Sequence, residues 1–228
     1  MTPLTPADLS QASLFASLDA QQLELILDRH RETKHPVDQV LVMEQDWGES
    51  VFLIISGLAK VRTFTADGDE VVMTVLGAGD VFGEMVAVDG SVRSADVVTL
   101  TPVQLVKLRI QPFSMLLRQQ ADFALALATL ETTRLRDLNR RFALQTADAT
   151  SRLLDALAYL ARKCSPDNDP LARIPVLPQK EIALLAGLAR ETASRTLSKL
   201  RSRGTVVEEE GSLKIVDPQP LIKRGLID

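Results

Sequence analysis

The pattern of hydrophobic and polar positions changes character several times along the chain. Residues 7–31 repeat apolar side chains at helical intervals, which predicts a helix. Its expected packing positions are Leu14, Phe15, Leu18, Leu23, Ile26 and Leu27. From Val37 to about Ile110, short runs of Val, Ile and Leu are separated by glycines, which is typical of an antiparallel sandwich or barrel. Asp67 and Gly68 lie between two such runs and predict a hairpin turn.

The helical pattern returns over residues 113–145 and lasts unusually long for a globular helix. One apolar stripe lies at or near heptad spacing and contains Ala124, Ala128, Leu135, Leu138 and Phe142. A neighbouring stripe contains Phe123, Leu127 and Leu130. A helix with two stripes can pack on its own domain and on a twin helix, so we predict a dimer seam here. The alternative is a helix buried only within its own chain. The expected solvated or ion-paired face carries Arg134, Arg136, Arg140 and Arg141.

A short hinge is expected at residues 146–148, then a helix over 149–163 and a polar loop over 165–169. Next come two short helices, at about 179–186 and 190–203, with Gly187 supplying the positive φ of a tight turn and Gly204 ending the second helix. Their inward positions are Ile182, Ala183, Leu185, Ala186, Leu197 and Leu200. This spacing is the helix-turn-helix pattern, in which the second helix enters the DNA major groove.

The strand pattern of residues 205–217 predicts a wing of two short strands that turn at Gly211 and Ser212. Thr196 stands in the second helix where a helix-turn-helix usually buries an aliphatic side chain.

The outward face of the second helix supports base reading. Arg190, Glu191 and Arg195 fall in its N-terminal half, where Arg can donate twice to guanine and Glu can accept from cytosine. The surrounding basic residues suit phosphate contacts, which position a protein without specifying sequence: Lys180, Lys199, Arg201 and Arg203. The alternative is a solvated helical pair with ordinary surface charges.

The charge distribution agrees with DNA binding at one end of the chain. The whole chain has a net charge of −4, but residues 1–149 carry 13 Lys and Arg against 20 Asp and Glu, which gives −7. Residues 150–228 carry 13 against 10, which gives +3. Phosphate affinity depends on a local basic face, so the asymmetry favours an acidic sensor joined to a basic reader.

Several classes are excluded by what the sequence lacks. No run of eighteen apolar residues exists, and the N-terminus lacks a basic region followed by an apolar one, so we expect neither a membrane span nor a secretory signal. The single cysteine, Cys164, excludes an internal disulfide and a multi-cysteine metal or iron–sulfur site. We expect a cytoplasmic protein with no metal and no catalytic residues.

The densest stretch of the β region is residues 82–95. Gly83 and Glu84 open a short helical segment, whose free N–H groups attract anions, and Arg93 and Ser94 follow near the next strand. An Arg inside an apolar barrel needs a partner. Glu84 alone could be that partner. Alternatively, Arg93, Ser94 and the N–H groups hold a phosphate while Glu84 accepts a hydroxyl proton.

Gly83-Glu84 with Arg93-Ser94 resembles the phosphate-binding cassette of cyclic-nucleotide-binding domains. Together with Arg190, Glu191 and Arg195, it resembles the catabolite activator family, or cyclic AMP receptor proteins, over nearly the whole chain. The resemblance implies that Gly83 and Ser94 touch the cyclic phosphate of cyclic AMP, that Glu84 takes the ribose 2′-hydroxyl and that Arg93 pairs with the phosphate charge. It implies that base and sugar are lined by Val61, Met73 and Thr74. It also implies a TGTGA target with an inverted TCACA.

One departure from the family concerns the long helix. Cyclic-AMP-responsive members usually carry two adjacent hydroxyl residues that contact adenine, one of them across the dimer, and the register here places Leu138 and Asn139 instead. Leu138 cannot donate, but the Asn139 amide can both donate and accept, as adenine recognition requires. We therefore hypothesise that Asn139 takes over part of that contact.

The resulting prediction is an α+β fold with an N-terminal antiparallel, jelly-roll-like β-roll sensor over 1–112, a long dimerisation helix and hinge over 113–147, and a C-terminal winged helix-turn-helix over 148–228. The predicted function is a homodimeric transcription regulator, activated by cyclic AMP, that binds double-stranded DNA and contacts RNA polymerase. Ligand would extend the central helices and reorient the readers.

Alternative functions are compatible with parts of this prediction. A regulator of the same fold could be independent of ligand or sense another signal. Iron–sulfur sensing needs cysteines that are absent, haem sensing has only His30, His35 and Cys164 as ligands, and two-oxoglutarate sensing would not require Glu84. An interaction protein without DNA binding would not need the basic reader. A cupin-type enzyme would need clustered histidines.

Overall fold

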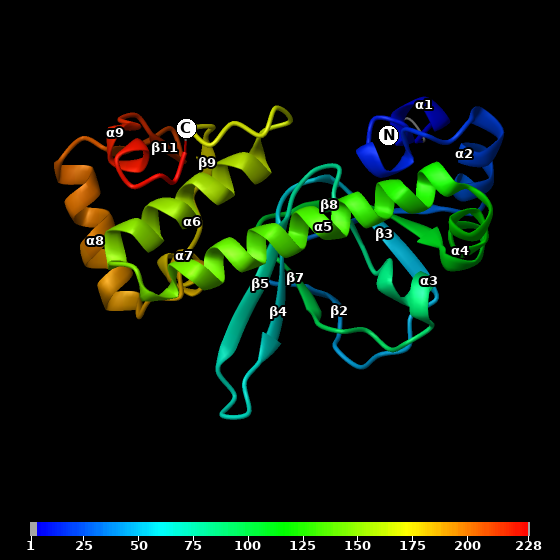
Figure 1. Cartoon of the computed structure of the whole chain (residues 1–228), viewed down its shortest axis with the longest axis horizontal. Helices are drawn as coiled ribbons and strands as arrows, with labels where there is room; N and C mark the ends of the chain where they lie inside the picture. Colours follow the sequence, from blue (N-terminus) through cyan, green and yellow to red (C-terminus); the bar gives the residue numbers. More distant parts are fainter. Residues whose placement is uncertain (1–3, 228) are drawn as a thin grey trace. The chain divides into compact units, whose positions relative to one another are not determined.

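The computed structural model describes residues 4–227, and its order of elements confirms the predicted α+β fold: antiparallel β-sheets, then a long helix, then a C-terminal helix-turn-helix (Figure 1). The chain divides into two compact units. The first contains residues up to Val61 together with Leu76–Asp137. The second contains Arg62–Val75 together with residues from Leu138 onward. None of the described helices combines the length and the apolar composition that crossing a bilayer requires.

The N-terminal region is helical as predicted up to Leu27, but it is divided into three short segments. It forms α1 (Pro6–Leu9), a 3₁₀ turn (Ser13–Phe15) and α2 (Ala20–Leu27). A separate helix begins after Asp19 because its carboxylate accepts from the backbone N–H of Gln22 at 2.8 Å, and the Gln22 side chain accepts from the Asp19 N–H. The expected packing positions are nevertheless all buried: Leu14, Phe15, Leu18, Leu23, Ile26 and Leu27.

The strands that follow form two four-stranded sheets, in the orders β1-β8-β3-β6 and β2-β7-β4-β5. A short helix, α3 (Met85–Asp89), interrupts them. The predicted hairpin joins β4 and β5, with Gly68 at φ 85° in its turn. The strands are β1 (Arg31–His35), β2 (Val40–Val42), β3 (Ser50–Ser56), β4 (Ala59–Phe64), β5 (Glu70–Leu76), β6 (Val81–Phe82), β7 (Asp96–Thr99) and β8 (Val103–Arg109).

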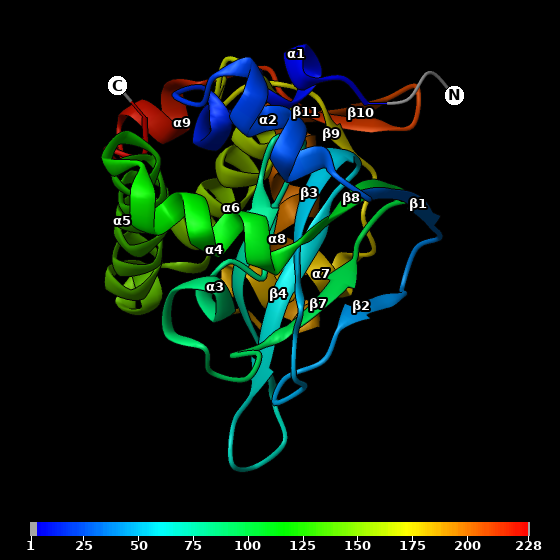
Figure 2. The ribbon, with the colours of Figure 1, turned by 90° about the vertical axis from the view of Figure 1, so that its right-hand side faces the viewer.

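The predicted long helix is interrupted at Gln120, where the backbone is extended, and it forms α4 (Ile110–Gln119) and α5 (Ala121–Ala143). Packing in the core explains why the helix is interrupted. The ring centroids of Phe113 and Phe123 are 5.1 Å apart, and both rings contact the ring of Phe15. On a straight helix, residues ten apart would be separated by about 15 Å along the axis, so the chain must bend between them. Helices α2 and α4 thereby lie beside β3 and β8 (Figure 2).

The two stripes predicted for the long helix are both present on α5. Phe123 and Leu127 are buried in the core of the first unit, and Leu130 packs against it. Leu135 and Phe142 are exposed, at 56% and 71%. Ala124 and Leu138 of the predicted heptad stripe are half-buried, and the use of this stripe as a dimer seam stays a prediction.

The second unit is built around α6 (Ala149–Cys164), which begins after the predicted hinge. Asp148 caps it by accepting from the backbone N–H groups of Thr150 and Ser151 at 2.9 and 3.1 Å. Most of the helix is buried, including Leu153, Leu154, Leu157 and Leu160. The other elements are a 3₁₀ turn (Leu144–Thr146), β9 (Ile174–Pro175), α7 (Gln179–Ala186), α8 (Arg190–Ser202), β10 (Val206–Glu209), β11 (Ser212–Ile215) and α9 (Gln219–Ile222).

The predicted helix-turn-helix is confirmed at α7 and α8, and its expected inward side chains are buried. Gly187 ends α7 at φ 62°, as the turn requires. Thr196 is buried without an orphaned hydroxyl, because its Oγ1 donates to the Thr192 carbonyl at 2.8 Å. The wing turns at Glu210 and Gly211, one residue earlier than predicted, because these two residues carry the paired positive φ angles, 50° and 72°, of a two-residue hairpin.

Candidate functional site

The cassette of residues 83–94 lies in the first unit, between β6 and β7. Gly83 has a φ of 80°, and Glu84 is the N-cap residue of α3. A Cβ on Gly83 would lie 2.4 Å from Arg93 Nη1, so the glycine serves both the left-handed backbone and the space for the arginine. Gly48 also leaves space for Arg93, since a Cβ added to Gly48 would lie 2.3 Å from the Arg93 guanidinium.

Arg93 is 6% exposed and is bound by backbone carbonyls. Its Nη1 donates to the Gly83 carbonyl at 2.8 Å, and its Nη2 donates to the Ser50 carbonyl at 2.6 Å. Burial holds the pKa of Arg93 below its usual value, while the charges of Glu84 and Asp46 oppose that effect. Within residues 4–227 Arg93 makes no ion pair, so its positive charge has no carboxylate at bonding distance.

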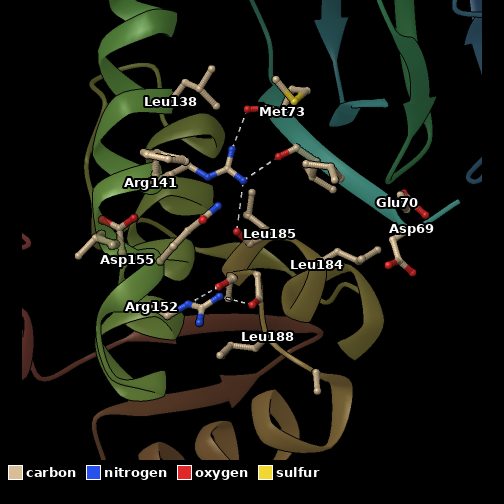
Figure 3. A pocket seen from close by; sticks show the side chains of 18 residues that line it. Asp69, Glu70, Met73, Leu138, Arg141, Arg152, Asp155, Leu184, Leu185 and Leu188 are labelled. Carbon is tan, nitrogen blue, oxygen red and sulfur yellow. Dashed lines mark hydrogen bonds between the residues drawn. The ribbon is translucent and has the colours of Figure 1, made fainter. Parts of the chain in front are cut away.

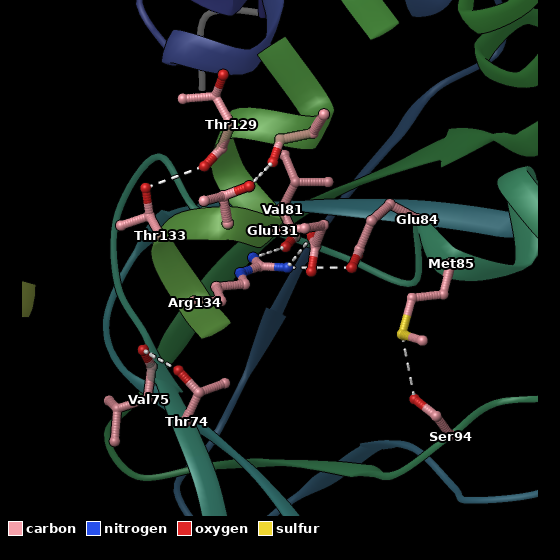
Figure 4. Close-up of polar contacts among 12 residues, drawn as sticks. Thr74, Val75, Val81, Glu84, Met85, Ser94, Thr129, Glu131, Thr133 and Arg134 are labelled. Carbon is pink, nitrogen blue, oxygen red and sulfur yellow. Dashed lines mark hydrogen bonds and ion pairs between the residues drawn. The ribbon is translucent and has the colours of Figure 1, made fainter. Parts of the chain in front are cut away.

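Glu84 is 4% exposed and pairs with a different arginine from the one we considered. Its Oε1 accepts from Arg134 Nη1 at 3.0 Å, and the same nitrogen donates to Glu131 Oε1 at 2.9 Å (Figure 4). Arg134 Nη2 donates to the Val81 carbonyl. Burial raises the pKa of Glu84 to about 7; Arg134 lowers it and Glu131 raises it. The pairing of Arg134 and Glu131 at helical spacing was the only sequence signal for this cluster.

One oxygen of Glu84 is left unsatisfied. Among the described residues, Glu84 Oε2 and Arg134 Nε are buried without a hydrogen-bond partner. A buried acceptor without a donor is costly, so the site favours a ligand that brings a hydroxyl or an N–H to Oε2. Together with the buried guanidinium of Arg93, which binds the Gly83 carbonyl and has no described carboxylate at bonding distance, these residues fit a ligand with both an anionic group and a hydroxyl, as a cyclic nucleotide has.

Ser94 is exposed, and its hydroxyl lies 3.4 Å from Met85 Sδ, a weak acceptor (Figure 4). Because this hydrogen bond is weak, the Ser94 hydroxyl loses little interaction energy when it rotates to donate to a bound anion instead. Val61 is half-buried in β4 and packs on the β-sheet core.

The remaining predicted ligand contacts belong to the second unit, and their convergence with Arg93 stays a prediction. Thr74 Oγ1 lies 2.8 Å from the Tyr159 hydroxyl, and the Met73 carbonyl accepts from Arg141 Nη1 at 2.8 Å. On α5, Leu138 is half-buried and Asn139 is exposed.

Two arginines hold the end of α7 within the second unit, beside a cavity of about 690 Å³ (Figure 3). Arg152 donates to the carbonyls of Ala186 and Gly187, and Arg141 donates to that of Leu185 at 3.3 Å. Cations at a helix C-terminus satisfy its free carbonyls and oppose its dipole. These contacts fix the turn that leads into α8.

The predicted base-reading residues Arg190, Glu191 and Arg195 are all exposed on α8, and they form no ion pair with any described residue. Lys180, Lys199 and Arg203 are exposed too. Arg201 is also exposed, and its side chain donates to Glu208 on β10, which ties the helix to the wing. Lys180 Nζ lies 4.0 Å from Glu70 Oε2, so two of the predicted phosphate contacts have carboxylate partners while the three predicted base readers have none within the described chain.

Known protein families match the N-terminal and the C-terminal half of the chain. Residues 32–120 match the cyclic nucleotide-binding domain family, and residues 151–224 match the Crp-like helix-turn-helix domain. The cyclic AMP receptor protein of Thermus thermophilus is 32% identical over 205 residues, 89% of this chain and 91% of the relative. A CRP-like cAMP-activated global transcriptional regulator of Mycobacterium tuberculosis is 27% identical over 219 residues, 95% and 98% of the two chains. The structure of FixK2 from Bradyrhizobium japonicum has the same fold, with a TM-score of 0.74, 19% identity and 85% and 96% coverage.

Proposed function

The chain belongs to the cyclic AMP receptor family of cyclic-nucleotide-binding transcription regulators, and on this premise we propose that it is a cytoplasmic homodimer that cyclic AMP switches to a DNA-binding form. The proposed division of labour is a sensor over 1–112, a dimerisation helix and hinge over 113–147 and a reader over 148–228. The observation that carries the ligand class is the combination of a buried guanidinium with no described carboxylate at bonding distance, that of Arg93, and an unsatisfied buried carboxylate oxygen, Glu84 Oε2.

In the proposed complex the cyclic phosphate lies against Arg93 and Ser94 and the backbone N–H groups that follow Gly83. Glu84 Oε2 accepts the ribose 2′-hydroxyl, which supplies the donor that this oxygen lacks. Val61, Met73 and Thr74 line the base and sugar. Thr74 must exchange or share its bond to Tyr159 to do so.

The preference for adenine is assigned to Asn139, whose amide can donate and accept, while Leu138 contributes only apolar contact. Substitution Asn139→Ala should weaken cyclic AMP binding more than cyclic GMP binding. Isothermal titration of both nucleotides, with cyclic di-GMP as a third ligand, measures this. Equal affinity of the variant and the parent for cyclic AMP would remove Asn139 from the site.

On DNA, Arg190, Glu191 and Arg195 would read TGTGA and its inverted TCACA in successive major grooves, while Lys180, Lys199 and Arg201 contact phosphates. The two-fold symmetry of the dimer matches the palindrome. RNA polymerase is the proposed partner at activated promoters. A regulator that is independent of ligand, or an interaction protein without DNA binding, would keep the fold but fail one of the two binding tests.

The decisive variant for the ligand is Arg93→Gln, matched with Arg118→Gln on the exposed surface of α4. Isothermal titration of both variants with cyclic AMP should show at least a tenfold loss for Arg93→Gln alone, because charge-assisted contacts contribute about 1.5–3 kcal/mol. Equal losses, or no binding by the parent protein, would exclude the proposed phosphate site.

A further inference from the structure

The wing carries a negative charge, although the C-terminal part of the chain to which it belongs is basic. Residues 205–217 contain one Lys against three Glu and one Asp, a net charge of −3, whereas residues 150–228 as a whole have +3. Glu208, Glu209 and Glu210 are consecutive where β10 leads into the turn, and all three are exposed. DNA phosphates repel carboxylates, so a wing of this composition opposes DNA binding unless cations neutralise it.

The register of the wing strands determines which glutamate reaches α8. Side chains alternate along a strand, so Glu208 shares a face of β10 with buried Val206, while Glu209 lies on the other face. The residue opposite Glu208 on β11 is Leu213, which is also buried. Glu208 therefore lies on the face of β10 that packs against α8, and its Oε2 accepts from Arg201 Nη2.

The position of Arg201 suits a contact with a DNA phosphate. Arg201 lies in the last turn of α8, about 16 Å along the helix axis from Arg190 at its first residue. The side chains of Arg201 and Glu208 are 37% and 42% exposed, so a phosphate can approach the guanidinium from solvent. It must then replace the Glu208 carboxylate or share the guanidinium with it.

Two other ion pairs of the second unit fit such an exchange less well. Lys180 Nζ lies 4.0 Å from Glu70 Oε2, and its side chain is 66% exposed, so a phosphate can bind this ammonium without displacing the carboxylate. Glu210 pairs with Arg173, which is not among the predicted DNA contacts. The exchange of a carboxylate for a phosphate is therefore best supported at Arg201.

We propose that Glu208 is a positioning residue for DNA binding: its carboxylate occupies the Arg201 guanidinium in the free protein, and a DNA phosphate must displace it. This inference rests on the proposed function, in which Arg201 contacts a phosphate. The displaced carboxylate remains beside the bound phosphate and reduces the attraction to every duplex, whatever its sequence. Glu208 thus sets the affinity of the reader for DNA and leaves its choice of bases unchanged.

Fluorescence anisotropy with two labelled duplexes measures this effect. The first is TGTGA-N6-TCACA with cyclic AMP, and the second is a scrambled duplex of the same length without it. Glu208→Gln should tighten binding to both by about threefold to tenfold, because one surface ion pair per protomer no longer competes with a phosphate. The plot of log affinity against log salt concentration should steepen by about one per protomer bound.

Two controls separate the ion pair from the overall charge. Glu209→Gln removes the same charge from the other face of β10 and should change both affinities by less than about twofold. In an Arg201→Ala background, Glu208→Gln should change them by less than about twofold as well, because the guanidinium for which it competes is absent.

Equal gains from Glu208→Gln and Glu209→Gln, or a gain that persists in the Arg201→Ala background, would overturn the proposal. Unchanged or weaker DNA binding by Glu208→Gln would also overturn it, since a pair that only held the wing in place would weaken binding when lost. If the nucleotide or the operator were assigned wrongly, binding to the first duplex would fail while the effect on the scrambled duplex remained measurable. Failure of the proposed function is therefore distinguishable from failure of this inference.

Discussion

Glu84 should make cyclic AMP binding depend on pH near neutrality. In the ligand-free protein, burial raises the pKa of Glu84 to about 7, so the carboxyl is partly protonated under ordinary conditions. The proposed contact needs a free Oε2 to accept the ribose hydroxyl, and the ligand therefore selects the ionised form. Binding should tighten as the pH rises and should release protons.

The magnitude follows from the pKa. With a ligand-free pKa of about 7, the ionised fraction of Glu84 rises from roughly one-tenth at pH 6 to roughly nine-tenths at pH 8. If the bound carboxylate stays ionised over this range, affinity increases by about tenfold between the two values. The charged groups beside Glu84 are Arg134, which lowers its pKa, and Glu131, which raises it.

The assay is isothermal titration of cyclic AMP at pH 6, 7 and 8, in buffers of different ionisation enthalpy so that proton release is measured directly. Glu84→Gln is the key variant, because its amide cannot ionise and its affinity should be lower but independent of pH. Any pH dependence that comes from other groups would persist in this variant, so it isolates the contribution of Glu84. A parent affinity that stays flat from pH 6 to 8, or a Glu84→Gln variant with the same slope as the parent, would refute the reasoning.

Three further outcomes are expected from other parts of the structure. Gly48→Ala should abolish cyclic AMP binding and leave the circular dichroism spectrum unchanged, because the added Cβ would lie 2.3 Å from the Arg93 guanidinium and would displace it. Cyclic AMP binding equal to that of the parent protein in isothermal titration would contradict the role of Gly48 in holding Arg93. Gly187→Ala should destabilise the protein by about 1–2 kcal/mol in urea unfolding, because alanine is strained at a φ of 62°; an unchanged midpoint would contradict this. Tyr159→Phe should lower the free energy of unfolding by about 1 kcal/mol by removing the bonds to Thr74 and to the backbone N–H of Val75, and equal stability would show them to be dispensable.

Local patterns in the sequence were sufficient for much of the fold. The helix-turn-helix is confirmed to within a residue at both helices, because a glycine follows the C-terminal end of each: Gly187 after α7 and Gly204 after α8. The β region, the hairpin at Gly68 and the buried N-terminal positions follow from similar local rules.

The errors arose where distant residues determine the local geometry. The break at Gln120 exists because Phe113 and Phe123 must both reach Phe15, a tertiary demand that helical periodicity does not report.

The sequence predicted which residues form the candidate site, but it did not predict which of their side chains bind one another. Arg93 and Glu84 were found from their spacing, and the sequence left open whether they pair with each other. The structure instead gives Arg93 two carbonyls and gives Glu84 the guanidinium of Arg134, about fifty positions later in the chain. Burial creates the unsatisfied oxygen of Glu84, and burial is a property of the folded core.

The most direct test of the account is binding to a labelled TGTGA-N6-TCACA duplex, with and without cyclic AMP, at one fixed salt concentration, because phosphate contacts vary steeply with salt. We expect tight binding only with cyclic AMP, lost in Arg195→Ala and retained in Arg118→Ala. Equal binding with and without the nucleotide would contradict the sensor, and no specific binding in either condition would contradict the assignment of Arg190, Glu191 and Arg195 as base readers.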